Sequence, residues 1–141
     1  VFLDLFSGSG GIALAAVSRG AKKAVLVENS RKAAACIQDN INFTKFNSFC
    51  DLKVMDALSA LRTLERRYVF DIIYMDPPYQ KGLELEALEY LKTSSLITED
   101  TLIIIETGLD ADISEYESGG YYAINRQKKY KTNQHVFLQK R

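Results

Sequence analysis

The sequence has few of the residues that build metal sites and disulfide frameworks. Its 141 residues include one histidine and two cysteines, Cys36 and Cys50, whose spacing matches no metal-ligand motif. We therefore expect reduced thiols, no metal, and a packing or surface role for His135. No apolar run approaches the length of a membrane helix and no signal-peptide pattern is visible, so we expect a cytoplasmic protein.

Repeats, low-complexity segments and linker-like stretches are also absent from the sequence. With 47% hydrophobic residues, the chain has enough apolar material for one globular domain with its own core. An apolar strand pattern starts at Val1 itself, and a chain rarely begins inside a central strand. We therefore expect a single domain over residues 1–141 that lacks an N-terminal segment, and we expect it to be a monomer.

The net charge is zero, but acidic side chains are missing from the end of the chain. Residues 126–141 carry six basic and no acidic side chains, so this tail has a charge of +6 and residues 1–125 have −6. Such a split indicates a polyanionic partner for the tail. We place that contact at Lys128, Lys129 and Lys131, near a predicted turn. The alternative is a basic hairpin that is simply solvated.

Strand and helix patterns alternate along the chain. Apolar runs predict strands at residues 1–6, 24–28, 52–55, 70–75 and 101–106, and alternation predicts an antiparallel pair at residues 121–127 and 134–139. Helical spacing predicts helices at residues 12–17, 30–42, 57–66 and 82–93. Alternating strands and helices form parallel sheets with right-handed crossovers. The predicted fold is therefore α/β and Rossmann-like, a doubly wound, mostly parallel sheet of about seven strands with a C-terminal antiparallel hairpin.

A glycine-rich turn, Ser7-Gly8-Ser9-Gly10-Gly11, joins the first predicted strand to the first predicted helix. Glycine lets the backbone approach a ligand closely, and the start of a helix offers free N–H groups. The second predicted strand ends on an acid, Glu28, and the third is followed by Asp56. Because ligands bind beyond the carboxyl ends of parallel strands, this pattern indicates a cofactor site.

The fourth predicted strand ends abruptly at Asp76-Pro77-Pro78-Tyr79. An amine on a conjugated ring is a poor nucleophile because its lone pair is delocalised into the ring. Asp76 and the carbonyl of Pro77 can each accept one N–H, which favours the electron-rich amine of a transition state. Pro77 and Pro78 stiffen the loop, and Tyr79 can stack on a base. The alternative is an acidic strand end followed by a structural Pro-Pro turn.

The pattern Asp4-x-x-x-Gly8-x-Gly10, with Glu28, Asp56 and the Asp76 loop, resembles class I S-adenosylmethionine-dependent methyltransferases. The wording from Leu3 to Gly10 is most similar to the RsmD family, which methylates a guanine N2 of small-subunit ribosomal RNA. The resemblance covers essentially the whole chain, although the turn at residues 128–133 lacks a glycine. It implies S-adenosylmethionine as cofactor, no metal, ribosomal RNA or the small ribosomal subunit as partner, and methylation of an exocyclic amino group.

The resemblance also implies roles for particular residues. Asp4 would fix the glycine loop and approach the methionine amino end of the cofactor, and Glu28 would bind the two ribose hydroxyls. Asp56 would accept from the adenine amino group, beside the N–H of Ala57. The Asp76 loop would hold the target base. The remaining cofactor contacts would come from Phe6, Ser7, Gly8, Ser9, Gly10 and Asn29.

Three alternatives stay open at this point. The first is a related target, adenine N6 or DNA. The second is a nicotinamide dehydrogenase, because Gly8-x-Gly10-x-x-Ala13 satisfies the dinucleotide fingerprint and Glu28 has the spacing of a ribose-binding acid. A dehydrogenase leaves Asp4 and the Asp76 loop unexplained. The third is a catalytically silent RNA-binding module, against which the intact Asp76 loop and Glu28 argue.

Overall fold

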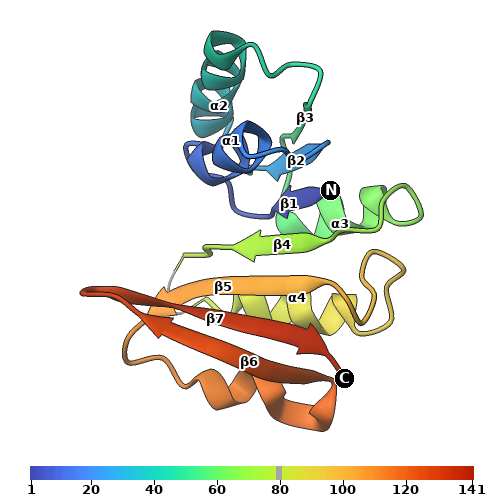
Figure 1. The fold of residues 1–141 in the computed structure, drawn as a ribbon, viewed down its shortest axis with the longest axis vertical. Coiled ribbons are helices and arrows are strands. Elements are labelled where there is room, and N and C mark those ends of the chain that lie inside the picture. Colours follow the sequence, from blue (N-terminus) through green and yellow to red (C-terminus); the bar gives the residue numbers. More distant parts are fainter. Residues whose placement is uncertain (79–80) are drawn as a thin grey trace.

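The structure is a computed structural model that describes residues 1–78 and 81–141. Within them, seven strands form one sheet in the order β3-β2-β1-β4-β5-β7-β6 (Figure 1). The first five strands are parallel, and β7 runs antiparallel between β5 and β6. This confirms the predicted fold class. The strands are β1 (Phe2–Asp4), β2 (Ala24–Val27), β3 (Cys50–Lys53), β4 (Ile72–Met75), β5 (Leu102–Gly108), β6 (Tyr122–Lys129) and β7 (Asn133–Lys140).

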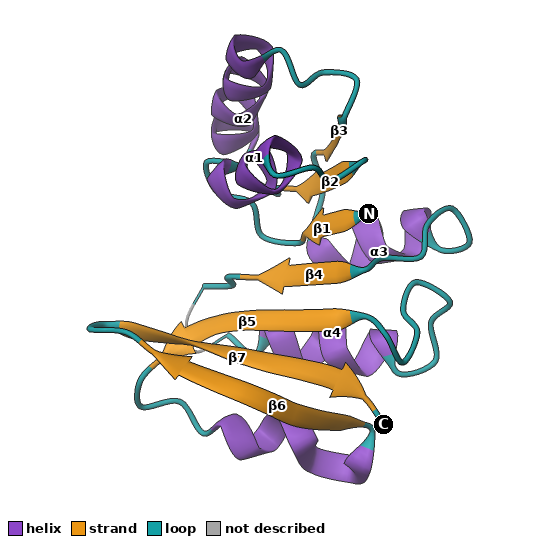
Figure 2. Cartoon of the chain, in the orientation of Figure 1, coloured by secondary structure: helices purple, strands orange, loops and turns teal. Residues whose placement is uncertain are grey.

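Five helical segments connect these strands (Figure 2). None of the helices in the described ranges is both long and apolar enough to cross a membrane. The helix between β5 and β6 is of the 3-10 type and was not predicted. The segments are α1 (Gly11–Ser18), α2 (Arg31–Thr44), α3 (Ala57–Leu64), α4 (Leu83–Leu91) and the 3-10 helix η1 (Ile113–Gly120).

Two element ends differ from the sequence prediction for a reason of pairing. The third strand ends at Lys53 instead of Met55, because β3 pairs with β2 only over its four half-buried residues. Such an edge strand has a weak hydrophobic pattern. The terminal hairpin extends to Lys129, because backbone pairing with β7 continues through the exposed polar end of β6. Backbone hydrogen bonds do not require apolar side chains, so the pattern placed β3 two residues too late and made β6 too short.

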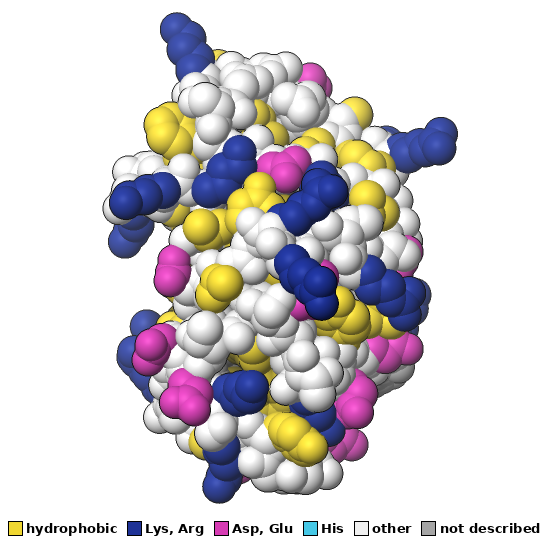
Figure 3. Space-filling view, turned by 90° about the vertical axis from the view of Figure 1, so that its right-hand side faces the viewer, with side chains coloured by type: hydrophobic (Ala, Val, Ile, Leu, Met, Phe, Trp, Pro, Cys, Tyr) yellow, Lys and Arg dark blue, Asp and Glu magenta, His cyan; other side chains and the backbone are white. Residues whose placement is uncertain are grey.

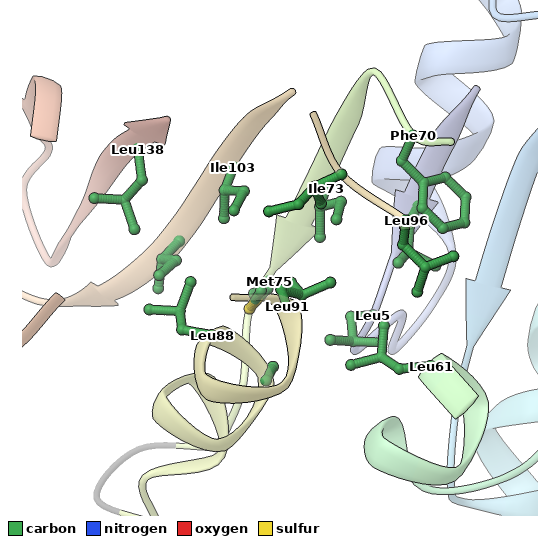
Figure 4. Close-up of a cluster of buried hydrophobic side chains, with 14 of the residues drawn as sticks. Leu5, Leu61, Phe70, Ile73, Met75, Leu88, Leu91, Leu96, Ile103 and Leu138 are labelled. Carbon is green, nitrogen blue, oxygen red and sulfur yellow. The ribbon is translucent and has the colours of Figure 1, made fainter. Parts of the chain in front are cut away.

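The sheet buries side chains on both faces because alternate residues of each strand point in opposite directions. Leu3, Ile73 and Ile103 pack with α3 and α4 in one cluster, which Figure 4 shows in close-up. Phe2 and Leu26 belong to a second cluster with α1 and α2. Helices therefore cover both faces, and the carboxyl edge of the parallel strands stays open.

Strand β1 is the point at which the strand order reverses: β2 and β3 lie on one side of it, and β4 and the later strands on the other. It pairs with β2 on one side and with β4 on the other, and Asp4 is in register with Leu26 and Tyr74. The crevice of an open α/β sheet lies at such a switch point, beyond the strand ends. Asp76, two residues past Tyr74, therefore lies just beyond the end of the strand next to that of Asp4.

Glu65, the residue after α3, links this helix to the segment after α4. Its carboxylate accepts hydrogen bonds from Tyr90 Oη, Ser94 Oγ and Ser95 N, each at 2.7 Å, and from the Ser95 hydroxyl. Partial burial disfavours the charged form, but hydrogen bonds from Ser95 and the other donors outweigh this effect. They lower the pKa of Glu65 from 4.5 to about 2.

We expect Glu65→Ala to lower the free energy of unfolding by about 1.5–3 kcal/mol at neutral pH, because several donors lose a charged acceptor. Since the folded-state pKa is depressed, this contribution is complete above pH 4.5 and is lost as the pH falls towards 2. Urea unfolding of wild type and variant, at neutral pH and near pH 3, measures both effects. Asp39→Ala, an exposed acid on α2, is the control. Equal unfolding midpoints for Glu65→Ala and wild type would contradict the prediction.

Candidate active site

A cleft of about 910 Å³ lies at the carboxyl edge of the sheet. The ends of β1, β2 and β4 line it, together with the glycine-rich turn and the first residues of α3. Tyr79 lies outside the described residues, and Gly10 and the three predicted RNA-binding lysines are not among the lining residues. The predicted site residues that line the cleft are Asp4, Phe6, Ser7, Gly8, Ser9, Glu28, Asn29, Asp56, Ala57, Asp76, Pro77 and Pro78.

The glycine-rich turn needs two left-handed residues, Gly8 with φ 58° and Gly10 with φ 80°. Gly10 is the N-cap of α1 and its N–H donates to the carbonyl of Ser7 at 2.8 Å. A Cβ at Gly10 would lie 3.2 Å from both Ile37 Cγ2 and Leu26 Cδ2. Gly10 therefore allows α1 to pack closely on β2 and α2, and its effect on the cleft is indirect.

Glu28 connects the end of β2 to the glycine-rich turn. Its Oε1 accepts from the N–H of Gly8 and its Oε2 from the N–H of Ser30, both at 2.9 Å. A carboxylate has about four acceptor positions, so each oxygen keeps one for a ligand. Glu28 therefore fixes the turn and still faces the cleft, a double connection that the sequence pattern did not reveal.

Asp4 is a buried acid, with 1% of its surface exposed. Its Oδ1 has no hydrogen-bond partner among the residues that the structure describes. Burial raises the pKa of Asp4 to about 7, with smaller raising contributions from Asp76 and Glu28, against hydrogen bonds from Ser7 and Phe6. A buried polar atom without a partner is costly. The site therefore suits a cationic donor group that would pair with Asp4 from within the cleft.

Asp56 and Ala57 place an acceptor and a donor side by side. Asp56 is the exposed N-cap of α3 and accepts from the N–H of Ser59 at 3.1 Å. Hydrogen bonds from Ser59 hold its pKa below the ordinary value. Ala57 is the first residue of α3, where a backbone N–H has no partner within the helix. A planar ring with an amino group beside a ring nitrogen would match this pair.

Asp76 follows β4 directly and is exposed at the cleft, while Pro77 behind it is buried. The protein around the carboxyl removes part of its hydration and raises the pKa of Asp76 to about 6. The charge of Glu106 and a hydrogen bond with it add to this shift, and His135 opposes it. Asp76 is therefore an accessible and unusually basic acceptor.

Sequence reasoning assigned no role to Glu106 and Tyr74, which also line the cleft. Glu106 ended the fifth predicted strand, as Glu28 ended the second. Its place at a strand end was therefore a signal, but its neighbours are set by the pairing of β5 with β7. The hydrogen-bond partners of Glu106 come from β4 and β7.

The tip of the β6–β7 hairpin lies at the same edge as the cleft (Figure 1). Asn133, the first residue of β7, pairs with Gly108 at the carboxyl end of β5. Lys128, Lys129 and Lys131 are exposed on this tip. Figure 3 views the opposite end of the molecule, where Lys and Arg are spread among acidic side chains. The basic group at the tip is therefore outside the cleft but on its side of the molecule.

Comparison with known proteins places the chain among methyltransferases. It matches the family described as conserved hypothetical protein 95 over residues 1–139. It is 29% identical over 129 residues to the putative rRNA methyltransferase YlbH of Bacillus subtilis, covering 91% of this chain and 69% of that protein. It is 25% identical over 126 residues to the ribosomal RNA small subunit methyltransferase D of Escherichia coli, covering 89% of this chain and 61% of that protein.

A solved structure of a conserved hypothetical protein from Streptococcus pyogenes is 36% identical, with a TM-score of 0.88, and covers 99% of this chain and 85% of that one. The chain thus spans 61% to 69% of the two curated relatives. The family match extends over nearly all of the chain. Both curated relatives are named methyltransferases, which argues against the dehydrogenase alternative. The chain belongs to the conserved hypothetical protein 95 family, the RsmD family that its glycine-rich turn and Asp76 loop resemble.

Proposed function

We propose that this protein transfers a methyl group from S-adenosylmethionine to an exocyclic amino group of a base in ribosomal RNA, with guanine N2 of the small subunit as target. Residues 1–141 would be its single methyltransferase domain. The observation that carries the proposal is the presence of Asp4 and Asp76 on neighbouring strands of one cleft. Asp4 offers a buried acceptor that has no partner among residues 1–78 and 81–141, and Asp76 offers an accessible one. The names of the two curated relatives support ribosomal RNA as substrate.

The lining residues fit the cofactor group by group. Asp4 would pair with its ammonium group, and the free acceptor positions of Glu28 would take the two ribose hydroxyls. Asp56 and the N–H of Ala57 would bind the adenine edge. The Gly8 backbone would pass close to the ligand without a Cβ in the way. The bound cofactor supplies a methyl group on a positively charged sulfur.

The protein then has to hold and activate the target amine. Asp76 and the carbonyl of Pro77 would accept its two N–H groups, which turns the nitrogen lone pair away from conjugation with the ring. Because proline has no backbone N–H, neither Pro77 nor Pro78 gives the loop a donor that would compete for this carbonyl. The stacking role predicted for Tyr79 falls outside the described residues and stays a prediction.

The test is methyl transfer from radiolabelled S-adenosylmethionine to small ribosomal subunits from cells that lack the gene. Mass spectrometry of the digested RNA is expected to show N2-methylguanosine. Detection of N6-methyladenosine instead would mean that the target is adenine N6 and not guanine N2. Transfer to DNA alone would contradict an RNA substrate. Product formed equally by Asp76→Asn would contradict the proposed role of Asp76 in activating the amine.

The basic hairpin tip is the proposed contact with the RNA backbone. Changing Lys128, Lys129 and Lys131 together to Ala is expected to weaken RNA binding. It should also reduce the slope of log K against log salt concentration by about 0.7–0.9 per lost phosphate contact. Filter binding or anisotropy with small-subunit RNA over a range of salt concentrations measures both quantities.

The matched control removes three basic side chains elsewhere. Lys22, Arg62 and Arg67 are exposed, in or next to the connections that lead into β2 and β4 at the opposite edge. Their triple change to Ala should leave the salt slope near the wild-type value. If the hairpin variant also keeps the wild-type slope, the tip is ordinary solvated surface.

A further inference from the structure

Glu106 is the centre of a hydrogen-bond network at the edge of the cleft. Its Oε1 accepts from Tyr74 Oη at 2.7 Å and lies 3.0 Å from His135 Nε2. Its Oε2 accepts from Asn133 Nδ2 at 3.3 Å. These partners come from β4 and β7, the two strands on either side of β5. Glu106 is therefore held by side chains from both neighbouring strands.

The network continues outward to the hairpin tip. His135 is directly opposite Glu106 in the register of β5 and β7. Its Nδ1 lies 3.3 Å from Tyr130 Oη. This geometry fits a neutral imidazole whose Nδ1 accepts a hydrogen bond from the tyrosine hydroxyl and whose Nε2 donates one to Glu106. Lys128 is the cross-strand neighbour of His135 on β6, with its ammonium 5.3 Å from the Tyr130 ring. Lys128 therefore connects this part of the network to the basic hairpin tip.

On the cleft side, Glu106 meets Asp76. Met75 is in register with Ile105, so Asp76 and Glu106 come next on the two neighbouring chain segments, and both line the cleft. Each carboxyl influences the ionisation of the other. Burial opposes ionisation of Glu106, but the hydrogen bonds from Tyr74 and His135 outweigh it and lower its pKa. Glu106 therefore stays negative and disfavours a second negative charge on Asp76. The other charged side chains that line the described part of the cleft are Asp4, Glu28, Asp56, Lys81 and Glu86.

We propose that Glu106, fixed in position by Tyr74 and His135, acts through Asp76: its negative charge beside Asp76 makes that carboxylate a stronger proton acceptor for the target amine. The inference rests on the proposed function. In the reaction, the amine nitrogen forms a bond to the methyl carbon, and the electron pair of the broken carbon–sulfur bond stays on sulfur. The methylated nitrogen then carries one surplus proton, which passes to the Asp76 carboxylate and from there to water. A more basic Asp76 draws this proton more strongly.

The effect of Glu106 on the pKa of Asp76 can be measured without a methyl-transfer assay. Carboxyl carbon NMR of the labelled protein, with Asp76→Asn to assign the signal, follows the titration of Asp76. Its apparent pKa is expected near 6 in the wild type. In Glu106→Gln it should fall by about one pH unit. An unchanged Asp76 titration in Glu106→Gln would overturn the proposal. Because this measurement needs no RNA, it decides the matter even if small subunits prove not to be the substrate.

The kinetic test uses small ribosomal subunits and radiolabelled S-adenosylmethionine. Glu106→Gln should lower kcat several-fold, leave KM for the subunits near wild type, and move the acidic limb of the kcat profile to lower pH. A loss of folding or a general loosening of the cleft would change KM and would not shift the limb. An equal loss of kcat at every pH would overturn the positioning role.

Two further variants make the kinetic result specific. Tyr74→Phe removes one donor to Glu106 with little change in volume, so it should shift the Asp76 titration in the same direction by a smaller amount. Glu99→Gln neutralises an exposed acid in the turn before β5 and should behave as wild type. If Tyr74→Phe raised the apparent pKa of Asp76, the proposed effect of Glu106 and its partners on Asp76 would be wrong.

Discussion

Asp76→Asn is expected to lower kcat for methyl transfer by about 10²–10³, with little change in the affinity for S-adenosylhomocysteine. Asparagine keeps the size of the side chain and one carbonyl acceptor, but it cannot hold the negative charge. That charge matters most when the amine becomes positive, which happens only in the transition state. The loss should therefore appear in kcat and leave cofactor binding intact.

The same reasoning gives a pH dependence for the wild-type enzyme. Asp76 accepts a proton only when it is ionised, and its pKa is raised to about 6. The rate should therefore fall as the pH drops through about 6, and this acidic limb should be missing from the residual activity of Asp76→Asn. Single-turnover transfer to small ribosomal subunits over a pH series measures it, with calorimetry for cofactor affinity.

The control for Asp76→Asn is Asp100→Asn, the same change at an exposed turn. It should leave kcat, its pH profile and cofactor affinity near wild type. An Asp76→Asn enzyme with near wild-type turnover would end the amine-activation mechanism. The Asp76 loop would then be a structural turn at the end of β4.

Glu28→Ala is expected to weaken S-adenosylhomocysteine binding by about 1.5–3 kcal/mol, or about 10- to 150-fold in Kd. Two losses contribute. The ligand loses the acceptor proposed for its ribose hydroxyls, and the N–H groups of Gly8 and Ser30 lose the carboxylate that links β2 to the glycine-rich turn. Isothermal calorimetry measures the affinity, and thermal unfolding without ligand measures the loss from the turn alone.

Glu28→Gln separates the two contributions. Its carbonyl oxygen can still accept from Gly8, so the turn should be less perturbed than in Glu28→Ala, while the charge-assisted bonds to a ligand are lost. Glu99→Ala removes an exposed acid far from the glycine-rich turn and should leave the affinity unchanged. Wild-type affinity in Glu28→Ala would remove Glu28 from the cofactor site.

Much of the site could be predicted from the sequence because the information is local. Glu28, Asp56 and Asp76 each lie at or just beyond the end of a predicted strand, and Asp4 lies in the last half of the first predicted strand. Parallel strands joined by right-handed crossovers bring those ends to one edge, whatever the precise register. An error of two residues in the third strand did not move Asp56 away from the cleft, because β3 still delivers the chain to the same edge.

Other features depend on how distant segments pair, and no local pattern contains that information. Glu106 meets His135 because β5 and β7 pair antiparallel in one particular register, and a slip of one residue would turn His135 to the opposite face. Gly10 is favoured because its φ of 80° is left-handed and a Cβ there would lie only 3.2 Å from Ile37 and Leu26, which come from other elements.

The sequence by itself therefore determined the fold class, the edge at which the cleft lies and most of its acids. Only the tertiary structure decided which acids touch, which of them are buried, and hence which carboxyls are shifted in pKa. The physical reason is that strand and helix patterns arise from neighbours along the chain. Desolvation and charge coupling between Asp4, Asp76 and Glu106 arise from packing between strands that are far apart in sequence.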